Sequence, residues 1–161
     1  MKIPLVLFAC GCFMISYAGC SFEKTPFKQK GNEILDTRNG NTWTRCPIGQ
    51  EWNEKKGCLG EMRLMNLDEA KAYATSLQLG WRVPSIEELA TLVDKRCQSP
   101  VLNERLFGKV QETGEGANFL SQTLYVEGDG TLRSLYYTID FMQGDVDAHT
   151  KGFVGAVRLM R

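Results

Sequence analysis

The chain has 161 residues, and its 19 lysine and arginine side chains are balanced by 19 aspartate and glutamate side chains. A net charge of zero gives no support for nucleic-acid binding, which usually requires a basic excess. We find no internal repeat and no low-complexity segment, and the length suits one domain with its own hydrophobic core.

The first 20 residues have the pattern of an export signal. Lys2 supplies a charged start, residues 3–15 are mostly apolar, and Ala18-Gly19 precede Cys20. The apolar run is shorter than the roughly 20 residues needed to cross a bilayer. A cysteine directly after two small residues resembles the lipobox of bacterial lipoproteins, in which the thiol carries the lipid.

This resemblance implies a signal peptide over residues 1–19 and a lipid on Cys20 that attaches the mature protein to a membrane. Ser21 stands where some lipoproteins have the aspartate that retains them at the inner membrane, so we expect an outer-membrane lipoprotein. The alternative is an ordinary signal peptide cut near Gly19, which releases a soluble protein. Residues 20–33 are predicted to form a tether before a domain over residues 34–161.

Three cysteines remain after the signal and the lipid site: Cys46, Cys58 and Cys97. Cys46 and Cys58 bracket a short loop rich in turn residues, so we predict a disulfide between them in an oxidising compartment. Cys97 is then either a buried free thiol or an alternative partner. The spacing of these cysteines matches no zinc finger.

The middle of the domain is predicted to be helical. Strands are expected first, at residues 32–36 and 42–45, joined by a turn at Asn39-Gly40. Two capping boxes follow, and they predict one helix from the cap Asn66 to Gly80 and another from the cap Ser85 to about residue 96.

The last third is predicted to be rich in strands. Residues 108–118 are typical of an exposed loop, residues 119–126 and 134–141 of two strands joined by a turn at 128–130, and residues 153–160 of a closing strand. Tyr136 falls opposite the apolar face of its strand, so we expect it to be exposed. Helices between flanking strands predict an α+β domain whose first and last strands pair.

Three blocks of sequence resemble one known family. They are TWTRCPIGQ at residues 42–50, WRVPSIEEL at residues 81–89 and AVRLM at residues 156–160. In this order they are similar to the C-terminal domain of bacterial collagen-like adhesins, over about residues 34–161. The resemblance implies a C-type-lectin-like fold related to that of formylglycine-generating enzymes, in exported proteins that usually have no assigned catalysis.

Arg82, Tyr125 and Tyr136 are the candidate binding residues. A guanidinium group binds sulfate or carboxylate, and aromatic rings stack on sugars. For Arg82 the alternative is structural: Trp81 belongs to the core, and Arg82 pairs with an acid to hold the loop before the second helix.

Asp140, Asp145 and Asp147 are the candidate metal ligands, because three carboxylates around a turn at Gly144 offer the oxygen donors that Ca²⁺ prefers. Their spacing is not that of an EF-hand loop, and solvated acids beside a turn are the alternative. Apart from calcium at this turn, we predict no cofactor.

The sequence does not suggest an enzyme. His149 is the only histidine, and no serine has the Gly-x-Ser-x-Gly elbow that often carries a nucleophile. The leading hypothesis is a lipid-anchored, non-catalytic binding module at the bacterial cell envelope that recognises a surface glycan or an envelope protein. The alternatives are an accessory lipoprotein that scaffolds a secretion or pilus assembly and, third, an enzyme with an atypical site.

Overall fold

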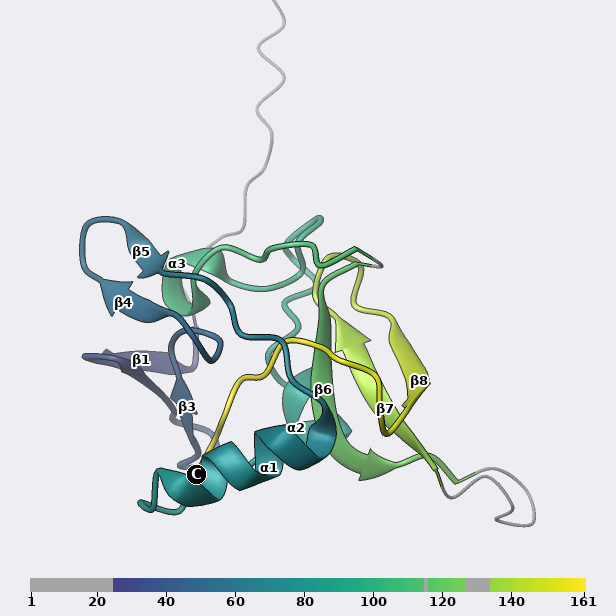
Figure 1. Cartoon of the computed structure of the whole chain (residues 1–161). Coiled ribbons are helices and arrows are strands. Elements are labelled where there is room, and N and C mark those ends of the chain that lie inside the picture. Colours follow the sequence, from purple (N-terminus) through teal and green to yellow (C-terminus); the bar gives the residue numbers. More distant parts are fainter. Residues whose placement is uncertain (1–24, 115, 127–133) are drawn as a thin grey trace, which may run out of the picture.

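The computed structural model describes residues 25–114, 116–126 and 134–161. This part of the chain holds three antiparallel sheets and three helices, which confirms the predicted α+β class (Figure 1). No helix within it has the length and apolar character needed to cross a membrane. The predicted signal peptide, the lipid site Cys20 and the turn at 128–130 lie outside the described residues.

The first sheet contains β1 (Phe27–Lys30), β2 (Glu33–Asp36) and β3 (Thr42–Thr44), in that order. β2 and β3 pair antiparallel, as the predicted hairpin requires. β1 lies in the segment predicted to be a tether, and it pairs antiparallel with β2. The sequence FKQK is polar and mostly exposed, so it carries no alternating pattern that would have indicated a strand.

A separate hairpin of β4 (Glu51–Asn53) and β5 (Gly57–Leu59) occupies the turn-rich loop between Cys46 and Cys58. Each strand has three residues, which is too short for a periodic signal in the sequence. Trp52 lies opposite Cys58 across this hairpin.

Both predicted capping boxes are present, at the starts of α1 (Leu67–Ser76) and α2 (Ile86–Ala90). In α1 the Asn66 side chain accepts the Glu69 backbone N–H, while the Glu69 carboxylate accepts the Asn66 backbone N–H. Ser85 and Glu88 make the same reciprocal pair at α2. Local hydrogen bonds therefore determine where both helices begin.

Both helices end earlier than predicted. At the end of α1 the hydroxyl of Ser76 donates to a carbonyl of the helix, and Gln78 and Leu79 adopt positive φ values of 60° and 35°. After α2 the hydroxyl of Thr91 donates to the Glu88 carbonyl. Such side-chain bonds compete with the continuing helix. The segment around Lys95 is consequently a loop and not a last helical turn.

A short helix, α3 (Glu104–Phe107), precedes the third sheet, which contains β6 (Asn118–Leu124), β7 (Leu135–Asp140) and β8 (Val146–Thr150) in that order. β6 and β7 lie where strands were predicted. α3 and β8 were not predicted. The predicted closing strand at 153–160 is wrong in form, because this segment makes single bridges to several elements and no continuous ladder.

The C-terminal segment nevertheless joins the two ends of the domain. It runs from β8 back to β3 (Figure 1), and the backbone groups of Thr42 and Arg161 exchange hydrogen bonds of 2.8 and 2.9 Å. Met160 bridges both Trp43 and Arg82. The prediction that the first and last parts of the domain pair is confirmed.

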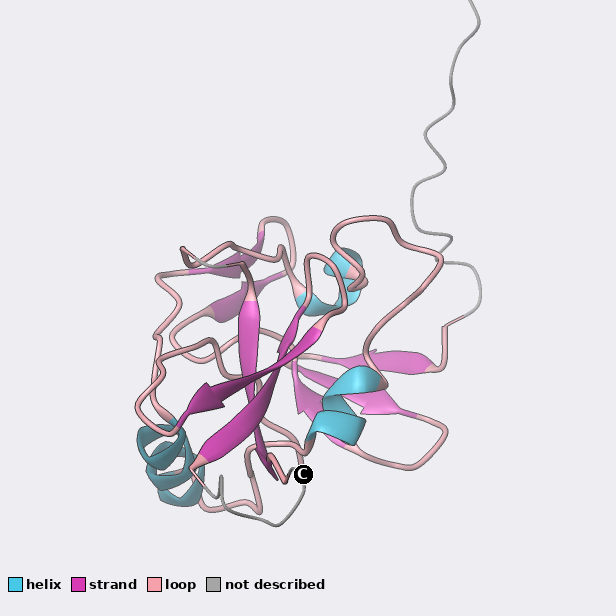
Figure 2. Ribbon diagram, turned by 90° about the vertical axis from the view of Figure 1, so that its right-hand side faces the viewer, coloured by secondary structure: helices cyan, strands magenta, loops and turns pink. Residues whose placement is uncertain are grey.

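Two hydrophobic clusters lie on opposite sides of β6, because successive strand residues point to opposite faces. Phe119 belongs to the cluster under α2, whereas Leu120 belongs to the cluster under α1. Figure 2 shows α1 and α2 on either side of the third sheet. The C-terminal segment contributes to both clusters, through Ala156 and Met160 on one side and Val157 and Leu159 on the other.

The expectation that Tyr136 is exposed is wrong, because both faces of β7 are covered. Tyr137 packs against the first cluster, and Tyr136 packs against the second and is only half exposed. Thr138, on the face predicted to be polar, is 1% exposed. The alternation of apolar and polar residues predicted one buried face. β7 is instead the central strand of its sheet, and a helix covers each of its two faces.

The ion pair between Arg82 and Glu88 predicts an acid-sensitive contribution to stability. Two hydrogen bonds from Arg82, at 2.7 and 2.6 Å, lower the pKa of Glu88 against the opposing effect of burial. A carboxyl group with a lowered pKa stabilises the fold above its unfolded-state pKa of about 4.3 and loses that effect as the pH falls through the folded value. We expect Glu88→Gln to cost about 1 kcal/mol near pH 7, since the pair is partly exposed, and progressively less toward pH 3.

Urea unfolding of the wild type and of Glu88→Gln across this pH range measures the difference. Glu61→Gln, at an exposed carboxylate, is the matched control. A difference between wild type and Glu88→Gln that does not change with pH would contradict the assignment.

Candidate functional site

A basic groove of about 580 Å³ lies between the β4–β5 hairpin and the chain around α3. Five cationic side chains and two carboxylates line it, together with neutral residues such as Gln29 and Gln111. The charged residues are Arg45, Lys55, Lys56, Arg105 and Lys109, with Glu54 and Glu104. The groove therefore has a net positive lining although the whole chain is neutral.

The predicted disulfide forms one wall of this groove. Cys46 and Cys58 are bonded, with their Cα atoms 5.6 Å apart, and closing this loop contributes about 3 kcal/mol. Gly108 lies against the sulfur of Cys58 with φ of 77°, and any Cβ at this position would collide with that sulfur. Only glycine lets the end of α3 approach the disulfide so closely.

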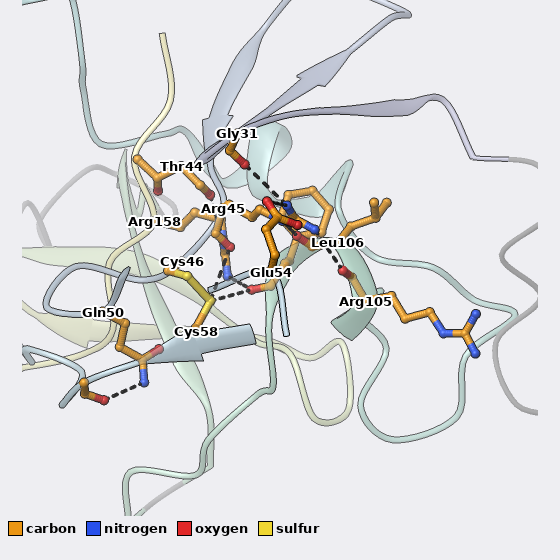
Figure 3. The surroundings of a disulfide bond; sticks show 12 residues. Gly31, Thr44, Arg45, Cys46, Gln50, Glu54, Cys58, Arg105, Leu106 and Arg158 are labelled. Atoms are coloured by element: carbon orange, nitrogen blue, oxygen red, sulfur yellow. Dashed lines mark hydrogen bonds and ion pairs between the residues drawn. A yellow bond between two sulfur atoms is a disulfide. The ribbon is translucent and has the colours of Figure 1, made fainter. Parts of the chain in front are cut away.

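Arg45 lines the groove but is buried, so it forms the floor. Figure 3 shows its side chain among Gly31, Glu54 and Leu106. Its guanidinium group donates to the carbonyls of Leu106 at 2.9 Å and Gly31 at 3.3 Å, and it lies 3.3 Å from the ring centre of Trp52. Burial lowers the pKa of Arg45, and Glu54 at 3.9 Å partly offsets this. An arginine remains charged at neutral pH despite such a shift.

Arg158 lies deeper, beneath Arg45, and is 1% exposed. It donates to the carbonyls of Thr44 at 2.7 Å and Phe107 at 2.9 Å, and also to that of Arg45. Burial lowers its pKa to about 9, so the group is still protonated at neutral pH. No carboxylate of the described residues lies within ion-pair distance, and the positive charge is met by backbone dipoles and by the faces of Phe107 and Phe119.

Arg45 and Arg158 together supply hydrogen-bond donors to the carbonyl groups at the end of α3. The last carbonyls of any helix lack partners within the helix and carry partial negative charge. The guanidinium group of Arg45 donates hydrogen bonds to the carbonyls of Arg105 and Leu106, and that of Arg158 donates to the carbonyl of Phe107. A four-residue helix is thereby held against β3 by two guanidinium groups, and the exposed side chains of Arg105 and Lys109 are placed at the rim of the groove.

Arg82, predicted as a binding residue, lies elsewhere and has the structural contact described above with Glu88. Its side chain is 41% exposed and lines a shallow hollow with Trp81 and Lys71. Trp81 in turn carries the guanidinium group of Arg161 at 4.7 Å from its ring centre. Arg82 therefore makes the contact expected of a structural residue, since it pairs with an acid and holds the loop before α2.

Tyr125 and Tyr136, the other predicted binding residues, do not form a common surface. Tyr125 makes an edge contact with Tyr137, with ring centres 5.3 Å apart. Tyr136 lies on the opposite face of β7, where Lys71 is 5.6 Å from its ring centre.

The three aspartates do not gather around a common point. Among the described residues, no group of three or more acidic, histidine or cysteine side chains is placed to hold a metal ion. The carboxylate of Asp140 accepts the backbone N–H groups of Ala117 and Met142, and that of Asp147 accepts the N–H of Ala148 and lies 3.8 Å from His149. Asp140 ends β7 and Asp147 lies in β8, and both carboxylates accept backbone N–H groups.

The sequence analysis missed the basic groove. Its walls come from residues 45–58 and residues 104–111, which are about 50 residues apart in the chain. In the sequence the adjacent Lys55 and Lys56 belong to the turn-rich loop between Cys46 and Cys58. Nothing in the sequence indicates that Arg105 and Lys109 lie opposite them.

Comparison with known proteins gives one family. The model of the Lcl C-terminal domain matches residues 32–161, which include every helix and all but one strand of the described structure. No curated protein matches the chain significantly.

We predict that Arg158→Met destabilises the fold by about 3 kcal/mol, because two buried carbonyls and one partly buried carbonyl lose the Arg158 donor. A buried carbonyl left unsatisfied costs roughly 1–3 kcal/mol. Arg158→Lys is expected to fall between this variant and the wild type, since an ammonium group cannot reproduce the planar fork. Urea unfolding of the disulfide-bonded protein, followed by tryptophan fluorescence, measures both.

The matched control is Arg63→Met at an exposed arginine, for which we expect a change within about 0.5 kcal/mol. If Arg158→Met were as stable as this control, Arg158 would not be the group that holds α3 in place.

Proposed function

Because the chain belongs to the Lcl C-terminal domain family, we propose that it is a non-catalytic binding module of the bacterial envelope that holds an anionic surface glycan in the basic groove. The observation that carries this proposal is the lining of the groove, in which cations outnumber carboxylates by five to two. A neutral protein that concentrates cations around one hollow is suited to an anionic ligand.

The arrangement of the charges supports a polymer rather than a compact ion. Lys55, Lys56 and Lys109 are exposed, and lysine ammonium groups act as mobile point charges that adapt to sulfate or carboxylate groups along a chain. Arg45 below them is fixed by its carbonyl partners and gives the floor a permanent positive charge. Half-exposed Trp52 offers an aromatic edge of the kind on which sugars pack.

The resemblance to collagen-like adhesins, with the C-type-lectin-like fold that it implies, supports an extracellular binding role. A lipid on Cys20 would hold the module at the outer membrane, with the groove free to face a ligand. Calcium is not needed in this account, because the groove contains its own cations. Binding is therefore expected to be unchanged by a calcium chelator and to weaken as salt screens the exposed charges.

We predict that Lys55→Glu/Lys109→Glu weakens binding to an immobilised sulfated polysaccharide by about tenfold or more. Each exposed ion pair contributes up to about 1 kcal/mol, and about 1.4 kcal/mol corresponds to a factor of ten. Surface plasmon resonance with sulfated, carboxylated and neutral polysaccharides, at several salt concentrations and with and without chelator, measures the effect.

Lys28→Glu/Lys95→Glu is the matched control, since it makes the same change in net charge at exposed residues outside the groove. Equal loss in both variants would show that only net charge matters and would contradict a groove site. Absence of any binding by the wild type, together with loss of a secretion or pilus assembly on deletion, would favour the scaffold hypothesis instead.

A further inference from the structure

Cys97 forms a disulfide bond, and it lies outside the basic groove. The residue is buried, with 4% of its surface exposed, and it is disulfide-bonded. Cys46 and Cys58 are bonded to each other. The other cysteines of the chain are Cys10, Cys12 and Cys20, all N-terminal to residue 25.

The start of the described chain lies beside the loop that carries Cys97. A hollow is lined on one side by Thr25, Pro26 and Phe27 and on the other by residues of the loop such as Asp94 and Arg96. Arg38, in the turn that binds the Pro26 carbonyl through Thr37, donates to the Thr91 carbonyl at 3.2 Å. Thr25, the first described residue, therefore lies across this hollow from the loop that carries Cys97.

Removal of the signal peptide then selects among the three cysteines. Cys20 is five residues before Thr25, a span of at most about 17 Å when extended. Cys10 and Cys12 are at least thirteen residues from Thr25 and belong to the predicted signal peptide, which export would remove. Of the three, Cys20 alone is expected to be retained in the mature chain.

We propose that Cys20 is the disulfide partner of Cys97, so that its sulfur has two alternative fates: a bond to Cys97 or a bond to lipid. The bridge forms when the two thiols give up two protons and two electrons to an oxidised dithiol protein of the export compartment, whose own disulfide is reduced to two thiols. A sulfur bonded to lipid carbon has no thiol to oxidise. The lipidated chain is consequently membrane-bound with Cys97 as a thiol, and the unlipidated chain is released with its N-terminus bound to the loop of Cys97.

Trypsin separates the four cysteines of the mature chain, which makes the proposal directly testable. Cleavage after lysine and arginine places them in peptides 20–24, 46–55, 57–63 and 97–105. The full chain is exported from a bacterial host in two forms, one with its own signal and one with the signal of a secreted, unlipidated protein placed before Cys20. Free thiols are alkylated, and the released and membrane fractions are digested without reduction and examined by mass spectrometry.

In the released chain we expect peptide 20–24 linked to peptide 97–105, and in the lipidated chain peptide 97–105 alkylated. Cys97→Ser is the control: it should leave peptide 20–24 alkylated in the released chain, with the link between 46–55 and 57–63 intact. Peptide 97–105 alkylated in the released chain, or linked to any other cysteine peptide, would overturn the proposal, as would a disulfide of Cys97 in the lipidated chain. The readout does not involve a ligand, so its failure leaves the groove proposal standing.

Discussion

The fold depends on two positive charges placed where a helix presents its negative end. α3 has only four residues and could not persist alone, since short helices are marginal without packing. Its terminal carbonyls point inward, toward the guanidinium groups of Arg45 and Arg158. Arg158 also binds carbonyls at the end of β3. One buried side chain from the last segment of the domain thus joins the first sheet to the helix before the third sheet.

This arrangement explains why the groove lies where it does. The disulfide joins β5 to the residue after Arg45, so the β4–β5 hairpin, β3 and α3 meet at one point (Figure 3). Hydrogen bonds to carbonyls offset part of the cost of burying Arg45 and Arg158, although Arg158 Nε has no partner. Within the described part of the chain no carboxylate pairs with Arg158, so its positive charge is not neutralised. The exposed lysines at the rim add to a field that the interior already provides. A buried charge in this domain therefore serves both folding and the proposed recognition of an anion.

Much of the local structure could be predicted from the sequence, because it depends on neighbouring residues. The capping boxes at Asn66 and Ser85 require only a side chain and a backbone N–H three residues apart, and both are present. The Cys46–Cys58 bond closes a short loop and was predicted for that reason. β1 and β8 were not predicted because their residues are largely polar, and pairing with a neighbouring strand determines their conformation. The site itself depends on contacts between residues far apart in the chain, and the charged residue in Ala156-Val157-Arg158 gave no hint of its partners.

The most direct test of this account is to map the ligand surface residue by residue, by following backbone amide resonances of the oxidised domain as a sulfated oligosaccharide is added. We predict the largest shifts at residues 54–58 and 105–109, on the two walls of the basic groove, with smaller shifts where Arg45 meets the end of α3. Shifts confined to the hollow beside Arg82, or to the face of β7 that carries Tyr136, would show that the domain binds through another surface and would contradict the central claim.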